Sequence, residues 1–153
     1  MTPRNNRIAA VAALATAIAV PAEGLRQFAY YDPPGILTVC AGHTGPDVVA
    51  NRIYSLAECK AFLTADMLKA VEQVEKCHPN LPENVHAAFA DAVFNLGPKV
   101  ACDSTASGFL EQGDYAAACA QLPRWNRARV GGVLVPLPGL TKRRAKEMAL
   151  CLA

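Results

Sequence analysis

The chain has 153 residues, 52% of them hydrophobic, and a formal charge of +2. This length suits one compact domain with its own core and is too short to expect two, and the charge is too small to argue for nucleic-acid binding. Seven basic residues gather late in the chain: Arg124, Arg127, Arg129, Lys142, Arg143, Arg144 and Lys146. A solvated helix face plus a loop explains them better than a binding surface for an anionic polymer.

The first predicted element is an uncharged helix over residues 8–22, which follows a polar start containing Arg4 and Arg7. A positive start before an apolar stretch that ends in small residues is typical of a secretory signal, although Pro21 counts against cleavage after Ala22. As a permanent membrane anchor the helix is marginal, because it would span about 22 Å and the hydrocarbon core is roughly 30 Å thick. An ordinary buried helix in a cytosolic protein is the third possibility.

Glu23, Asp32 and Thr38 lie in the short, turn-rich segment that follows this helix. An aromatic strand, a tight reversal at Asp-Pro-Pro-Gly and a returning strand predict a hairpin over residues 28–40. A hairpin folds the chain back on itself, so we expect the two acids and the hydroxyl to lie near one another.

The surroundings of the two acids predict different protonation states. Burial at the end of an apolar helix would raise the pKa of Glu23 and keep it protonated, whereas Asp32 lies in a polar turn where ionisation is easier. Hydrolysis of a glycosidic bond needs this division, with one carboxylic acid protonating the leaving oxygen and one carboxylate steering water or stabilising positive charge on the sugar. Thr38 would hold the water. The alternative is two solvated carboxylates with no joint role.

The middle of the chain predicts a third strand and two long helices. Ile53 and Tyr54 suit a short strand, and Ser55-Leu-Ala-Glu58 is a capping box that begins a helix running to about Lys76. This helix is expected to link a small β-containing lobe to a helical one. Apolar residues at helical spacing predict a core helix over residues 82–96. His86 falls outside that apolar stripe, so we expect it to be exposed, and His78 lies in a turn.

The last third predicts short helices, a loop and a final helix. Residues 103–111 and 114–122 suit two short helices, and Trp125 is expected to pack between helices rather than stack on a sugar. Glycines and prolines over 130–139 predict a loop or hairpin, and Thr141 is expected to cap a helix ending near Leu152. We find no phosphate loop, metal cluster or Ser-His-Asp order, so no cofactor is expected.

Six cysteines without a Cys-x-x-Cys pair argue against zinc and against a thioredoxin-type site, and favour disulfides formed in an oxidising compartment. Free thiols in a cytosolic protein are the alternative. Six cysteines allow 15 pairings, and the sequence does not settle which one forms. The favoured pairing has each bridge flank one helix or supersecondary unit: Cys40 with Cys59, Cys77 with Cys102, and Cys119 with Cys151.

Residues 23–44 contain four features in order, which are E-G-L-R, an aromatic strand, D-x-x-G and T-V-C-x-G-H-T. In this order they resemble the catalytic segment of the phage lysozyme family, glycoside hydrolase family 24. The resemblance continues through Val93-Phe-Asn-Leu-Gly97, Arg124-Trp125 and residues 139–147. It implies an α+β fold, mainly helical and two-lobed, with a small antiparallel β-hairpin sheet in the N-terminal lobe. It also implies an ion pair between His43 and Asp66 in place of a catalytic histidine.

The activity that the resemblance implies is hydrolysis of the β-1,4 bond between N-acetylmuramic acid and N-acetylglucosamine in peptidoglycan, with inversion. Glu23 would be the general acid, Asp32 the carboxylate that orients water, and Thr38 the holder of that water. We expect a monomer. A lytic transglycosylase, which cuts the same bond with one glutamate, and a non-catalytic wall-binding module are the rival interpretations.

Residues 1–22 resemble the signal-anchor-release segment of endolysins in the same family, which leaves residues 23–153 as the catalytic domain. The resemblance implies an inactive enzyme tethered to the host inner membrane through residues 8–22, facing the periplasm, and later free in the periplasm. Cleavage would remove the helix that positions Glu23, so an uncleaved segment is favoured. Some relatives exchange disulfides through a cysteine in the anchor, but here no cysteine precedes Cys40, so refolding alone would switch the enzyme on.

Overall fold

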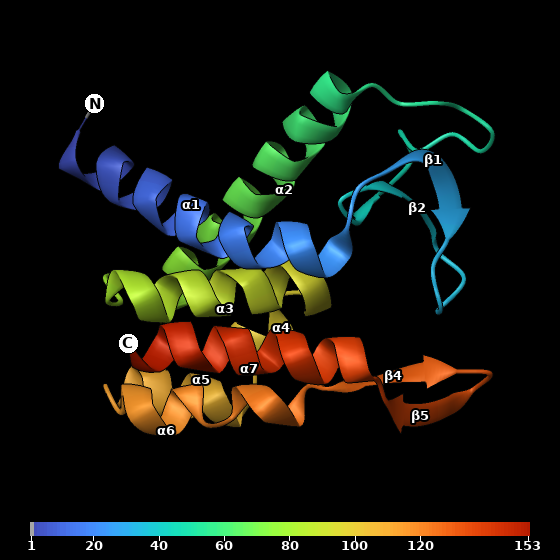
Figure 1. Cartoon of the computed structure of the whole chain (residues 1–153). Coiled ribbons are helices and arrows are strands. Elements are labelled where there is room, and N and C mark those ends of the chain that lie inside the picture. The colour runs from blue at the N-terminus through green and yellow to red at the C-terminus, as the bar shows by residue number, and fades with distance from the viewer. Residues whose placement is uncertain (1) are drawn as a thin grey trace.

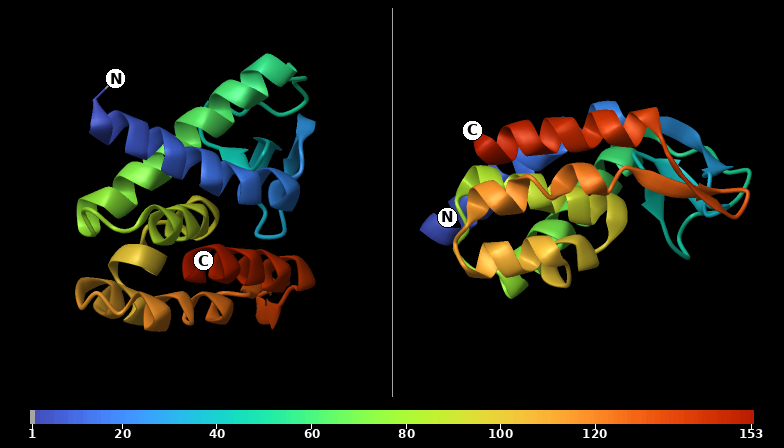
Figure 2. Two further views of the ribbon diagram at one scale, coloured as in Figure 1. Left: turned by 60° about the vertical axis from the view of Figure 1, so that its left-hand side comes forward. Right: turned by 90° about the horizontal axis from the view of Figure 1, so that it is seen from below.

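Two small antiparallel sheets extend from the same end of a helical lobe in the computed structural model, which describes residues 2–153 (Figures 1 and 2). The sheets have the strand orders β1-β2-β3 and β4-β5. In chain order the elements of the described residues are α1 (Pro3–Glu23), β1 (Arg26–Tyr31), β2 (Leu37–Cys40), β3 (His43–Thr44), α2 (Leu56–Cys77), α3 (Glu83–Leu96), α4 (Lys99–Cys102), α5 (Thr105–Glu111), α6 (Tyr115–Cys119), the 3-10 turn η1 (Leu122–Arg124), β4 (Arg127–Val130), β5 (Val133–Pro136) and α7 (Pro138–Leu152). This arrangement confirms the α+β, mainly helical fold that the sequence predicts.

Helix α1 packs into the helical lobe, beside α3 and across α2 (Figures 1 and 2). The Thr2 hydroxyl caps its start by accepting from the Asn5 amide, and the helix ends at Gly24, whose φ of 71° suits glycine. One face of the helix is buried and consists of Val11, Ala15, Ile18 and Ala19. The small side chains of the two alanines let the helix backbones approach closely. Within the described residues α1 is also the one helix long and apolar enough to cross a membrane.

The first turns of α1 are held by a partly buried polar cluster around Arg7. Its guanidinium donates to Glu75 Oε2 at 3.0 Å and to the carbonyl of Leu81, and its Nη2 lies 3.3 Å from His86 Nδ1. His86 Nε2 lies 2.9 Å from the carbonyl of Val71. Donation from Nε2 leaves Nδ1 as an acceptor for Arg7.

The expectation that His86 is exposed is wrong, because α1 covers this face of α3 and buries the ring completely. Burial lowers the pKa of His86, so the ring is neutral, as its acceptor role toward Arg7 requires. His78 is also buried, and its Nε2 lies 2.7 Å from the carbonyl of Ala101.

Helix α2 begins at the predicted capping box, in which Ser55 Oγ accepts from the Glu58 amide and Glu58 Oε1 accepts from the Ser55 amide. The third strand of the sheet is β3, whereas Ile53 forms only a single bridge with Phe28. Tyr54 is fully buried. Its hydroxyl accepts from the Val49 amide and donates to the Asp47 carbonyl, which fastens the loop before it.

The C-terminal part of the chain agrees with its prediction at the glycine-rich stretch, which forms the β4–β5 hairpin, one of the two alternatives expected there. It differs at the start of α7 and in the burial of two arginines. Helix α7 begins at Pro138, so Thr141 is not its cap and instead accepts from the Asn126 side chain at 3.1 Å. Arg143 and Arg144 are buried, not solvated, because α7 lies against α3 (Figure 1).

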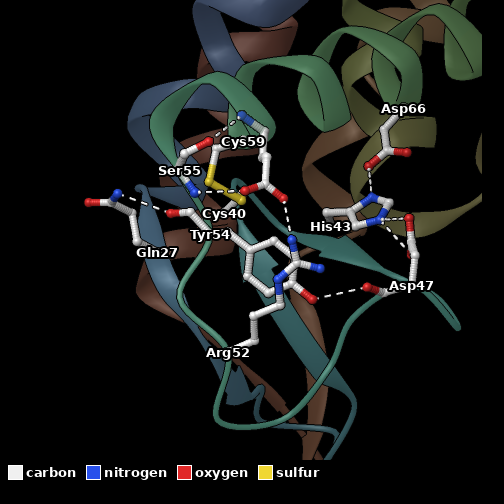
Figure 3. Close-up of a disulfide and its surroundings, with 10 residues drawn as sticks. Gln27, Cys40, His43, Asp47, Arg52, Tyr54, Ser55, Cys59 and Asp66 are labelled. Atoms are coloured by element: carbon white, nitrogen blue, oxygen red, sulfur yellow. Dashed lines mark hydrogen bonds and ion pairs between the residues drawn. A yellow bond between two sulfur atoms is a disulfide. The ribbon is translucent and has the colours of Figure 1, made fainter.

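All six cysteines form disulfides in the favoured pairing. Cys40–Cys59 fastens β2 to α2 (Figure 3), Cys77–Cys102 joins the end of α2 to α4, and Cys119–Cys151 joins α6 to α7. None of the three bridges involves α1, so this helix is held by noncovalent contacts, which are its packing, the Arg7 cluster at its start and an ion pair of Glu23 at its end.

Replacing Glu75 with Gln should therefore loosen α1. The change removes a charged partner of Arg7, and we expect the free energy of unfolding to fall by about 1–3 kcal/mol, with faster proteolysis inside α1. Glu72→Gln, an exposed site on the same helix, is the matched control. Thermal unfolding and limited proteolysis check this, and equal behaviour of the two variants would contradict it.

Candidate active site

Glu23 is the last residue of α1, and its side chain is 19% exposed. The carboxyl group lies against the backbone of Gly42, where a Cβ atom would come within 3.0 Å of Glu23 Cδ and Oε2. Gly42 also has a φ of 78°, which favours glycine. The turn between β2 and β3 thus forms a close-fitting seat for the Glu23 carboxyl group.

The apolar surroundings expected for Glu23 are wrong on its inner side, where Arg143 Nη1 donates to Glu23 Oε1. The other nitrogens of Arg143 bind Asp91 in α3, with Nε 2.9 Å from Oδ2 and Nη2 2.8 Å from Oδ1. Burial opposes the charge of Arg143, but Asp91 and Glu23 outweigh it and raise the pKa of the guanidinium.

Asp32 and Thr38 face each other across the β1–β2 turn. Asp32 Oδ1 accepts from the Ile36 amide at 2.7 Å, which fixes its carboxylate. Thr38 Oγ1 lies 3.5 Å from Asp32 Oδ2 and 2.9 Å from the Ile36 carbonyl. The hydroxyl has one proton, which it can donate to the nearer Ile36 carbonyl or to Asp32, and its oxygen stays free to accept a hydrogen bond.

Glu23, Asp32 and Thr38 line one groove of about 520 Å³ between the hairpin sheet and the helical lobe. A larger hollow of about 920 Å³, beside the start of α1, contains none of the three. The groove is also lined by residues that were not predicted for the site, from both lobes: Arg26 and Tyr30 in β1, Phe94, Asn95 and Leu96 in α3, Arg127 and Ala128 in β4, and Leu137 and Leu140 near the start of α7. Burial, and then the charge of Glu23, raise the pKa of Tyr30.

Trp125 packs against the helical core and does not line the groove, which agrees with the packing role predicted for it. Arg143 is the main residue that sequence reasoning missed. The available signal was Asp91, a carboxylate within the apolar stretch of residues 85–93, because a buried carboxylate needs a cationic partner.

His43 has the structural role that the sequence predicts (Figure 3). Its Nδ1 lies 2.6 Å from Asp66 Oδ2, Nε2 lies 2.9 Å from Asp47 Oδ1, and the ring stacks on Phe62 at 4.0 Å. Burial opposes charge on His43, but the hydrogen bonds that its ring donates to Asp66 and Asp47 prevail and raise its pKa. The histidine therefore ties the turn after β3 to α2.

Comparison with known families and proteins shows what this chain is similar to. A family model described as phage lysozyme matches residues 21–147. A SAR-endolysin of Bacteriophage PS119 is 39% identical over 131 residues, which is 85% of this chain and 76% of that protein. A SAR-endolysin of Enterobacteria phage P21 is 37% identical over 131 residues, again 85% of this chain and 77% of the relative.

Two solved forms of one endolysin, P1 phage Lyz, match to different extents. The active form aligns with a TM-score of 0.77 at 26% identity, covering 91% of this chain and 83% of that one. The secreted inactive form aligns with a TM-score of 0.53 at 25% identity, covering 71% and 75%.

The raised pKa of His43 predicts a pH-dependent contribution to stability. Since the folded-state pKa of His43 exceeds the ordinary histidine value of 6.5, the contribution is fully present below about pH 6.5 and is lost as pH rises through the folded-state pKa. The difference in unfolding free energy between the native chain and His43→Gln should thus be larger at about pH 5.5 than at about pH 8.5. Chemical denaturation at both pH values checks this, and an equal difference would contradict it.

Proposed function

This chain belongs to the phage lysozyme family, and from that premise we propose that it hydrolyses the β-1,4 bond between N-acetylmuramic acid and N-acetylglucosamine in peptidoglycan. It is a lysozyme of the endolysin type. The observation that carries the proposal is the groove, which is lined by Glu23, Asp32 and Thr38 together.

Glu23 acts as the general acid and protonates the leaving oxygen. Donation requires the acid form, in which Oε2 can carry the proton while Oε1 still accepts from Arg143. Asp32, held by the Ile36 amide, orients the attacking water or supports the positively charged sugar, and Thr38 accepts a hydrogen bond from that water. An inverting mechanism leaves room for the water, with carboxyl groups roughly 6.5–9.5 Å apart. The presence of Asp32 and Thr38 favours hydrolysis over the single-glutamate chemistry of a lytic transglycosylase.

The first helix acts first as a membrane anchor. In this account residues 1–22, of which Met1 lies outside the described residues, hold the monomeric enzyme in the host inner membrane, and residues 23–153 form the catalytic domain on the periplasmic side. The length and apolar character of α1 and the names of the SAR-endolysin relatives support this. After release into the periplasm the helix packs against α3.

The tethered form is inactive because an inserted α1 holds Glu23 at the membrane, away from Gly42 and Arg143. The described conformation represents the working enzyme, and its better match to the active form of P1 Lyz than to the inactive form supports this. Since no disulfide involves α1, activation needs withdrawal and refolding of the helix and no thiol exchange.

Glu23→Gln tests the acid. A general acid contributes about 10²–10⁴-fold to the rate, so the variant should fold normally and lose at least about a hundredfold in the release of reducing sugar from purified peptidoglycan. Glu111→Gln, at an exposed site, is the control. Full activity of Glu23→Gln would falsify the assignment. Anhydro products would identify a transglycosylase, and binding of peptidoglycan without cleavage would identify a wall-binding module.

Gly42→Ala tests the seat of the carboxyl group. The new Cβ would push Glu23 out of position, so activity should fall at least tenfold. Gly113→Ala is the matched control, because its φ of 73° imposes similar backbone strain while nothing lies within 4 Å of the new Cβ. Both variants should lose about 1–2 kcal/mol of stability. Equal activities of the two folded variants would contradict the prediction.

A further inference from the structure

A chain of buried charged residues lies directly behind Glu23. Arg143 and Asp91 are 3% and 0% exposed, and Arg144 and Glu147 next to them are fully buried. Residues of this kind are rarely buried unless they are paired. These come from α3 and α7, whereas Glu23 comes from α1, so the network joins three helices at the catalytic acid.

Asp91 determines how Arg143 is oriented. The contacts of Nε at 2.9 Å and Nη2 at 2.8 Å engage both carboxylate oxygens of Asp91. A two-point contact between planar groups fixes the plane of the guanidinium. The remaining nitrogen, Nη1, is thereby aimed at Glu23 Oε1.

Asp91 also compensates the charge of Arg143. A cation beside a general acid favours the ionised carboxylate, which cannot donate a proton. With a full negative charge on Asp91 in direct contact, Arg143 does not require a second anion. Glu147 pairs with Arg144 at 2.8 Å, and its Oε1 lies 4.0 Å from Arg143 Nε, farther than the Asp91 oxygens. Burial, and then a hydrogen bond with Asp91, raise the pKa of Glu147 to about 10, so Asp91 is the main anion beside Arg143 within this network.

We infer that Asp91 is a positioning residue for catalysis: it aims Arg143 so that the guanidinium holds the Glu23 carboxyl toward the groove, and it offsets the Arg143 charge so that Glu23 can carry the proton it donates. The inference rests on the proposed role of Glu23 as the general acid. Asp91 itself is fully buried and touches no substrate.

The other charged groups around Glu23 lie on the hairpin side, where Arg26, Tyr30 and Asp32 line the same groove, with Arg127 on β4. Within residues 2–153, Arg143 is the one side chain that bonds directly to Glu23. Asp91 is therefore the residue whose charge can be removed with the least change to the groove.

Asp91→Asn in the released full-length protein tests the inference through the pH dependence of kcat on soluble peptidoglycan fragments. The uncompensated Arg143 should favour ionised Glu23. The alkaline limb of the pH–rate profile, where kcat falls as pH rises, should therefore move to lower pH by about one unit. At neutral pH kcat should fall about tenfold with little change in KM. Asp103→Asn, an exposed site with the same change of net charge, should leave the limb in place.

The position of the limb is independent of how much of the variant folds, because misfolded protein lowers only the amplitude. If Asp91→Asn yields no folded protein, Asp91→Asn with Arg143→Gln removes both charges. The alkaline limb of that double variant should lie above that of the native chain, since the nearer charge, the cation, is gone. An unmoved limb in every folded variant would overturn the inference.

The outcome also separates this inference from the proposed function. If Glu23→Gln is inactive and the Asp91 variants keep the native limb, only the role of Asp91 fails. If Glu23→Gln remains active, the acid assignment itself fails, whatever Asp91 does.

Discussion

The contact between Glu23 and Arg143 joins the first helix to the last one, and the groove that we propose as the active site depends on it. Glu23 is the final residue of α1, so its position is set by how α1 packs against α3. Gly42 supplies the space on one side and Arg143 the hydrogen bond on the other. A displaced α1 would leave the groove with Asp32 and Thr38 but without its acid.

The composition of α1 suits both of the states that we propose for it. Alanines at positions such as 15 and 19 allow close contact with α3 in the folded protein, and they gain little on transfer to a bilayer. The same helix can therefore be a weak anchor and a good core element. Arg7 adds a specific contact to the folded state, since Glu75 and the carbonyl of Leu81 receive its guanidinium.

Local sequence signals predicted much of the fold and the candidate site. The Asp-Pro-Pro-Gly reversal and the Ser55 capping box predicted the hairpin and the start of α2, because each depends on neighbouring residues. The disulfides follow the favoured pairing, which was one of the 15 that the sequence left open. The surroundings of Glu23 and the burial of His86 and Arg143 could not be predicted in this way, because they depend on contacts between helices far apart in the chain. Asp91 in an apolar helix was the available signal of such a contact.

The most direct test of the account is the activity of the full-length protein while α1 is inserted in lipid vesicles, measured on soluble peptidoglycan fragments small enough to reach a tethered enzyme. The account predicts no hydrolysis above background before release, and hydrolysis that appears in step with release. If inserted protein cleaves the fragments as fast as released protein, the groove is complete without docking of α1, and the account is contradicted.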